Sequence, residues 1–284
     1  MISHLSSVPG WVDTSVRTPG SAILLVRFVA LAGILVSTLE HLSNWRQFRA
    51  GGLFDWKIMG SRPELAGGGA LASALSGVLS FHGYLAVLGI RLLAILLLLT
   101  NPHVRALEAV GLTIILATTI LINLRSPLGQ DGADQMATII FTSLWINLFA
   151  VWDSRITHAC IWFIALQSCL SYCVSGVAKA MGETWRRGEA VFRIFNTQTY
   201  GQAAAAGFLR DHRAMNAWLT WSTVIIETAF PLVLVLPLPV GCLFLAWGFA
   251  FHLMNAIVMG LNSFLWSFAA TYPAIVYCAL SWRS

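Results

Sequence analysis

Charged side chains are scarce in this sequence. Only 10% of the 284 residues are charged, whereas 57% are hydrophobic and the mean hydropathy is +0.75. A soluble globular domain carries about 25% charged residues, so this composition excludes an ordinary water-soluble enzyme. It indicates an integral membrane protein instead, because each helix that crosses the roughly 30 Å hydrocarbon layer needs about 20 apolar residues.

Familiar catalytic and metal-binding motifs are absent as well. The sequence contains no Walker loop, GxSxG elbow, HExxH pair or GxGxxG turn, so nucleotide-binding, hydrolase and zinc-protease functions lack support. No set of ligands at helical spacing points to a metal centre. The cysteines are scattered through apolar segments without CxxC spacing, so we expect free thiols. They are Cys160, Cys169, Cys173, Cys242 and Cys278.

Eight apolar runs are each long enough to cross a bilayer. We therefore predict an all-α, polytopic membrane helix bundle with about eight transmembrane helices, forming a single domain over residues 1–284 in the cell membrane. Prolines in and after the sixth run predict a kink there. The runs are 20–40, 81–101, 105–124, 135–152, 156–182, 215–238, 240–260 and 263–282, and the prolines are Pro231, Pro237 and Pro239.

Two connecting segments, residues 41–63 and 183–213, combine basic with aromatic side chains. This combination is typical of helices that lie in the membrane interface, and it favours membrane lipids as partners over nucleic acid. The stretch 64–80 is weakly hydrophobic and fits either a re-entrant segment or the start of the second span. The connecting segments after spans one, three and five contain ten lysines and arginines, and the segments on the opposite side of the membrane contain four. The positive-inside rule places the richer side in the cytoplasm.

Among the ionisable side chains inside the predicted spans, we single out five. A charge in hydrocarbon costs about 2.5 to 3.5 kcal/mol on insertion scales, so such groups usually face a partner or a cavity. We expect a buried polar cluster in which Arg27 or Arg91 pairs with Glu227, and this pairing fits a structural role as well as a functional one. The five residues are Arg27, Arg91, Lys179, Glu227 and His252.

Lys179 is one of two lysines in a chain that has 15 arginines. An arginine cannot lose its proton in a protein, whereas a desolvated lysine can lose it and then act as a base or nucleophile. The lysine therefore indicates proton transfer, although a lysine that snorkels to the interface fits the same pattern. His252 and Asn255 lie on one helix face and fit a pair that orients a polar ligand or relays a proton.

Asp131 and Asp134 lie in the most polar stretch between two spans, beside Gly129 and Gly132. Paired carboxylates fit an acid–base site. The same residues also fit a tight turn with a helix N-cap, which is the interpretation we favour.

Three short motifs together resemble the horizontally transferred transmembrane (HTTM) family, which shares its membrane domain with vitamin K-dependent gamma-glutamyl carboxylase. The first motif is Tyr172, Ser175, Gly176, Val177, Lys179, Trp185 and Gly188. The second is Phe251-His252-Leu253-Met254-Asn255 with Gly260, and the third is Gly132-Ala133-Asp134. The resemblance implies that Lys179 deprotonates a reduced quinone of the vitamin K type, with His252 and Asn255 as further catalytic residues. The candidate substrate-binding residues are Arg27, Arg91, Asp134, Tyr172, Trp185 and Glu227.

The sequence departs from the carboxylase in two ways. The large lumenal domain has no counterpart, and Gly132-Ala133-Asp134 stands where a catalytic histidine is expected, so the resemblance does not extend to glutamate carboxylation. Short bacterial members look like the membrane protein that matures the sporulation-delaying peptide toxin, which implies a secreted peptide precursor as a partner. We predict a membrane-embedded enzyme that acts on a quinol, a lipid or a secreted peptide. The alternatives are a non-catalytic peptide maturation or export factor and a transporter with Glu227 as its coupling group.

Overall fold

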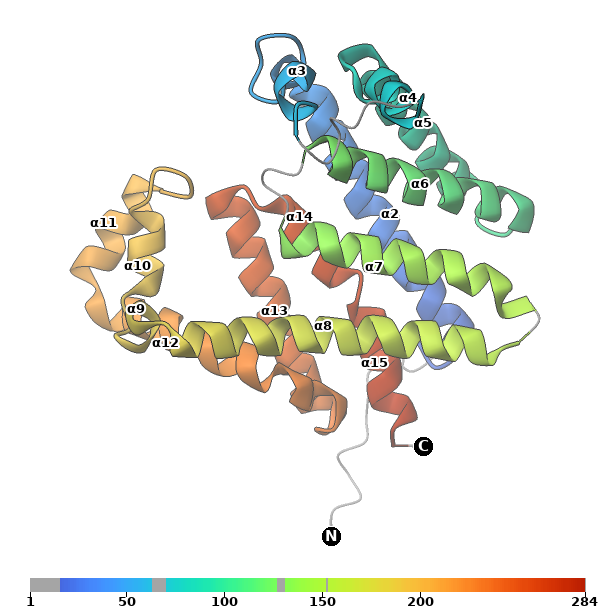
Figure 1. Ribbon diagram of the computed structural model, residues 1–284. Helices are drawn as coiled ribbons and strands as arrows, with labels where there is room; N and C mark the ends of the chain where they lie inside the picture. The colour runs from blue at the N-terminus through green and yellow to red at the C-terminus, as the bar shows by residue number, and fades with distance from the viewer. Residues whose placement is uncertain (1–15, 63–69, 127–130, 152, 284) are drawn as a thin grey trace. The chain divides into compact units, whose positions relative to one another are not determined.

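The computed structural model describes residues 16–62, 70–126, 131–151 and 153–283. Within these residues there is no β-strand, and eight helices are long and apolar enough to cross a membrane (Figure 1). The predicted all-α bundle of eight membrane-spanning helices is therefore confirmed, and the chain is a multi-pass membrane protein.

The chain divides into two compact units. One unit contains residues 1–26 and 157–284, and the other contains residues 27–156. Helix α2 (Pro19–Ser43) and helix α8 (Arg155–Met181) each have residues in both units. The single functional domain expected from the sequence stays a prediction.

The unit of residues 27–156 contains four of the spans and the first connecting segment. Short helical turns follow the first span, and a ten-residue helix precedes the second. The elements are α2 (Pro19–Ser43), η1 (Trp45–Phe48), α3 (Trp56–Met59), α4 (Ala70–Leu79), α5 (Phe81–Thr100), α6 (Arg105–Arg125), α7 (Gly132–Ile146) and η2 (Asn147–Val151).

The other unit contains the remaining spans and the second connecting segment, which forms three short helices. The last span is formed by two helices in succession. The elements are α8 (Arg155–Met181), α9 (Glu183–Arg186), α10 (Ala190–Phe195), α11 (Ala203–Asp211), α12 (Arg213–Ala229), η3 (Phe230–Leu234), α13 (Leu238–Met259), α14 (Asn262–Ala269) and α15 (Tyr272–Ser281).

Local sequence signals explain several of the helix ends. α12 stops at Ala229 and continues as a 3-10 turn that contains Pro231, as expected for a residue that lacks a backbone N–H. In the described part of residues 64–80, α4 is a separate helix from α5. The Ser80 side chain caps the start of α5, because its hydroxyl accepts a hydrogen bond from the Gly83 N–H.

Asp131 caps the start of α7. Its side chain accepts hydrogen bonds from the N–H groups of Ala133 and Asp134, and the Asp134 carboxylate accepts one from the Asp131 N–H in return. This is a capping box, and it confirms the helix cap favoured from the sequence. Gly129, the other residue of the predicted turn, lies outside the described residues. The five cysteines are free, as predicted.

Arg125 ends α6 and is fully buried. Its guanidinium donates to the carbonyl groups of Leu79, Phe54 and Phe48 at 3.0, 3.0 and 3.1 Å. It also lies 5.0 Å from the centre of the Phe48 ring and 4.4 Å from that of Tyr84. One side chain thereby holds the first connecting segment against α4, α5 and α6.

Candidate functional site

A cavity of about 410 Å³ lies within the unit of residues 157–284, among α8, α9, α10, α12, α13 and α14. Aromatic and aliphatic side chains form most of its wall, and a small number of polar groups face the same space. This volume and this lining are typical of sites for small, largely apolar molecules. The polar residues of the wall are Ser171, Tyr172, Ser175, Lys179, Thr223, Glu227, His252 and Asn255.

The charged part of the wall is an ion pair between α8 and α12. The Lys179 Nζ lies 2.6 Å from the Glu227 Oε2 and also donates to the Ser175 hydroxyl. The lysine side chain is 20% exposed and that of the glutamate 3% exposed, so the amine does not extend into bulk solvent. The Trp185 ring lies 5.4 Å from the amine, within the range of a cation–π contact.

Gly176 lets the two helices approach closely enough for this pair. A Cβ atom built on Gly176 would lie 2.4 Å from the Thr228 backbone nitrogen and 2.5 Å from its hydroxyl. Gly176 is three residues before Lys179, and Thr228 directly follows Glu227. The missing side chain therefore sets the separation of α8 and α12 where the ion pair forms.

A second polar group is centred on Tyr172. Its hydroxyl lies 2.7 Å from the His252 Nε2 and 3.1 Å from the Tyr272 hydroxyl. The imidazole stacks on Phe268, with ring centres 4.7 Å apart and planes tilted by 17°. Its Nδ1 has no hydrogen-bond partner among the described residues. The histidine is thus held by its Nε2, and its Nδ1 is buried without a hydrogen bond.

Six of the predicted site residues line this one cavity. They are Lys179, His252, Asn255, Tyr172, Trp185 and Glu227. The other three, Arg27, Arg91 and Asp134, belong to the unit of residues 27–156 and are not among the lining residues.

The predicted pairing of Glu227 with an arginine is wrong. Glu227 pairs with Lys179, whereas Arg27 forms an ion pair with Glu108 and donates to the Pro102 carbonyl at 2.7 Å. Arg91 is buried and interacts electrostatically with Asp134. Hydropathy shows which residues lie at membrane depth but not which helix faces meet, and Glu108, the partner of Arg27, lies in the first turn of an apolar helix.

Sequence reasoning missed three contributors to the cavity and its hydrogen bonds. Ser175 holds the lysine amine, Tyr272 holds the Tyr172 hydroxyl, and Phe268 stacks on the histidine. Ser175 could have been found, because it lies one helical turn before Lys179 on the same face. The other two come from the last span, and nothing in their spacing relates them to α8 or α13.

No group of three or more histidine, cysteine, aspartate or glutamate side chains that could hold a metal ion occurs in the described part of the chain. The polar groups of the cavity are those of proton transfer and hydrogen bonding: an amine, a carboxylate, an imidazole, hydroxyls and an amide. Comparison of the chain with protein-family models, with curated proteins and with solved structures finds no match.

Proposed function

We propose that this protein is an enzyme of the HTTM type in the cell membrane, which binds a quinol in the apolar cavity and removes a proton from its hydroxyl group. One observation carries the proposal. The Lys179–Glu227 ion pair opens onto a space of about 410 Å³ that is otherwise mostly apolar, in a part of the chain that crosses the membrane. Ionisable side chains within membrane spans raise the free energy of insertion, so they are taken as functional by default.

The lining fits a flat, apolar ring that carries hydroxyl groups. Phe251, Phe264 and Phe268 offer aromatic faces or edges for stacking, which is favourable at ring separations of about 4.5 to 7 Å. The Asn255 side chain also lines the cavity. It supplies a polar contact that fixes a hydroxyl-bearing ring in one orientation.

The ion pair defines how the proton moves. At rest the 2.6 Å contact holds an ammonium against a carboxylate, so a free amine is not the resting base. When the lysine passes its proton to Glu227, its amine accepts the proton of the substrate hydroxyl. The substrate then carries one negative charge, the pair carries one additional proton, and the ammonium faces the new oxyanion. Such positioned proton transfer contributes about 10²- to 10⁴-fold to a rate.

Lys179→Arg tests this step. The arginine keeps the positive charge and the ion pair but cannot release its proton, and Glu227→Gln removes the final acceptor with little change in size. The assay follows dissolved O₂ consumption by a naphthoquinol with a short isoprenoid tail, with the protein in nanodiscs. The deprotonated quinol reacts with O₂ and a proton to give the quinone and hydrogen peroxide. We expect the native protein to accelerate this reaction and each variant to lose about 100-fold or more of the acceleration.

Lys57→Arg is the matched control, because Lys57 is the other lysine and is exposed. It should keep the native rate. Binding of the quinone is measured separately by quenching of tryptophan fluorescence. Full activity of Lys179→Arg would refute proton transfer by this residue. Quinone binding by the native protein without any acceleration would indicate a binding function instead.

A further inference from the structure

A second cavity, of about 570 Å³, lies among the short helices of the connecting segment and the start of α12. Four arginines from four successive parts of the chain line it, together with one glutamate. The arginines are Arg187, which follows α9, Arg193 of α10, Arg210 of α11 and Arg213, the first residue of α12. None of these residues lines the cavity that contains Lys179.

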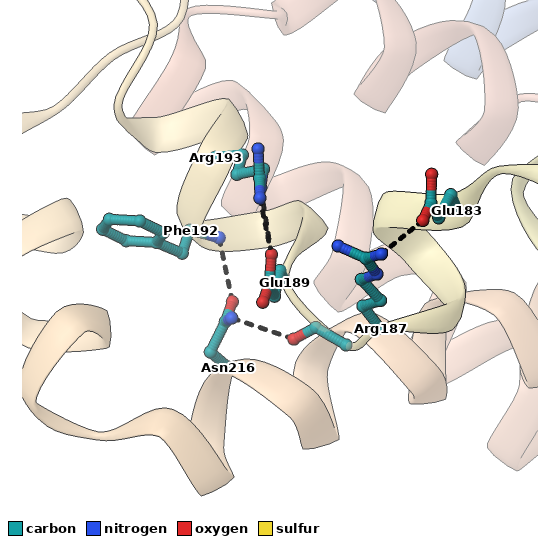
Figure 2. A network of polar contacts seen from close by, with 7 residues as sticks. Glu183, Arg187, Glu189, Phe192, Arg193 and Asn216 are labelled. Atoms are coloured by element: carbon teal, nitrogen blue, oxygen red, sulfur yellow. Dashed lines mark hydrogen bonds and ion pairs between the residues drawn. The ribbon is translucent and has the colours of Figure 1, made fainter.

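The floor of this arginine cavity is fixed by Asn216, which is 7% exposed. Its amide donates to the Gly188 carbonyl at 2.9 Å and accepts from the Phe192 N–H at 2.8 Å, as Figure 2 shows. Gly188 has a φ of +72°, and a Cβ atom there would lie 3.1 Å from that of Ala217. The backbone of the cavity is therefore held in place by α12 rather than being a loose surface loop.

Two of the four arginines have an acidic partner. Arg187 pairs with Glu183 at 2.5 Å and Arg193 pairs with Glu189 at 2.7 Å (Figure 2). Neither Arg210 nor Arg213 forms an ion pair within the residues that the structure describes, and Asp211, between them in sequence, does not line the cavity. Hydrogen bonding to Arg193, with the fields of Arg187 and Arg213, holds the pKa of Glu189 below its ordinary value. The cavity thus carries a surplus of positive charge.

We infer that this arginine cavity binds a phosphate-bearing anion, and that its natural source is the headgroup of an anionic phospholipid. Guanidinium groups match the geometry of phosphate oxygens. The position supports a lipid, because α12 is itself a membrane span and begins at Arg213. Phe208, Met215 and Trp218 are exposed on α11 and α12 and adjoin lining residues in the sequence, and aromatic side chains are enriched at the membrane interface.

The test uses protein purified in an uncharged detergent and short-chain lipids as probes. Dioctanoyl phosphatidylglycerol, dioctanoyl phosphatidylcholine and inorganic phosphate are titrated separately, and the unfolding midpoint Tm is followed, because a ligand that binds the folded state raises it. We expect phosphatidylglycerol to raise Tm and phosphatidylcholine to leave it unchanged. An equal rise with inorganic phosphate would assign the site to free phosphate rather than to a lipid headgroup.

The double variant Arg210→Gln/Arg213→Gln should need about 10- to 30-fold more phosphatidylglycerol than the native protein for the same rise in Tm. Arg49→Gln/Arg186→Gln is the matched control, since it removes two exposed arginines that do not line the cavity. Equal weakening in both double variants would show general surface attraction and overturn the proposal. Arginine-dependent binding of an acidic decapeptide without any preference for phosphatidylglycerol would also overturn it. Tm without ligand confirms that each variant is folded.

Discussion

Arg125 shows how one buried guanidinium holds a connecting segment. Three carbonyl groups accept its hydrogen bonds, and no other residue type presents so many donors in a fixed planar arrangement. We expect Arg125→Lys to lower the free energy of unfolding by about 2 to 4 kcal/mol, because an ammonium cannot reach all three carbonyl groups and each one left buried without a partner costs about 1 to 3 kcal/mol.

Thermal unfolding of the purified protein measures this change. Arg49→Lys is the control, because Arg49 belongs to the same connecting segment and is exposed. Surface substitutions of this kind usually change stability by less than about 0.5 kcal/mol. A stable Arg125→Lys protein would show that the carbonyl contacts are dispensable.

At the scale of single elements, the packing of α8 against α12 depends on Gly176. A methyl group there meets backbone and hydroxyl atoms of Thr228 rather than the end of a flexible side chain, so the helices must separate. We expect Gly176→Ala to destabilise the protein by about 2 kcal/mol, in the range known for overpacked interiors. It should also weaken quinone binding, because the Lys179–Glu227 pair spans the same contact.

Gly89→Ala provides the comparison for this glycine. Gly89 lies inside α5, and nothing lies within 4 Å of the Cβ atom that the substitution adds. Alanine in a helix interior is favoured over glycine by about 0.5 to 1 kcal/mol, so this variant should be equal to the native protein or more stable. Chemical or thermal unfolding distinguishes the two outcomes, and a loss of stability in both variants would refute the steric argument.

The elements themselves were largely predictable from the sequence. Runs of apolar residues gave all eight spans within a few residues, because the length needed to cross hydrocarbon is fixed. A helix cap at Asp131 or Asp134 followed from local spacing alone, and the structure places it at Asp131. The buried position of Arg125 did not, since it depends on carbonyl groups contributed by Phe48, Phe54 and Leu79, which lie far away in the sequence.

For the candidate site, the sequence pointed to residues but not to their contacts. A lysine, a glutamate and a histidine at membrane depth were singled out by their cost in hydrocarbon, and the structure places all three on the wall of one cavity. Their partners were not predicted. Whether Glu227 meets Lys179 or an arginine depends on helix rotation and on the close approach at Gly176, which hydropathy does not encode.

At the scale of the whole molecule, the distribution of arginines predicts the orientation in the membrane. The side after spans one, three and five carries ten of the basic residues, so we expect it to face the cytoplasm. In intact cells, a membrane-impermeant maleimide should label Val104→Cys, between the second and third spans, but not Ser61→Cys, after the first. Both variants are made with Cys242, an exposed cysteine, replaced by serine.

Permeabilised cells provide the control for this labelling, because Ser61→Cys should then react as well. Both positions are exposed, so a difference between them reports the side of the membrane rather than burial. The opposite labelling pattern would invert the orientation, and it would move the arginine cavity to the outer leaflet with it.

The pairing of Lys179 with Glu227 also limits what is able to leave the site. Their opposite charges cancel, so an uncharged molecule enters from the bilayer without an electrostatic barrier. After the proposed transfer, the ionised ligand and the protonated pair again sum to zero, but a departing anion would strand a cation in a poorly solvated space. In the proposed reaction, exchange is therefore restricted to neutral species, and the ionised intermediate is retained until it regains a proton or is oxidised to an uncharged product.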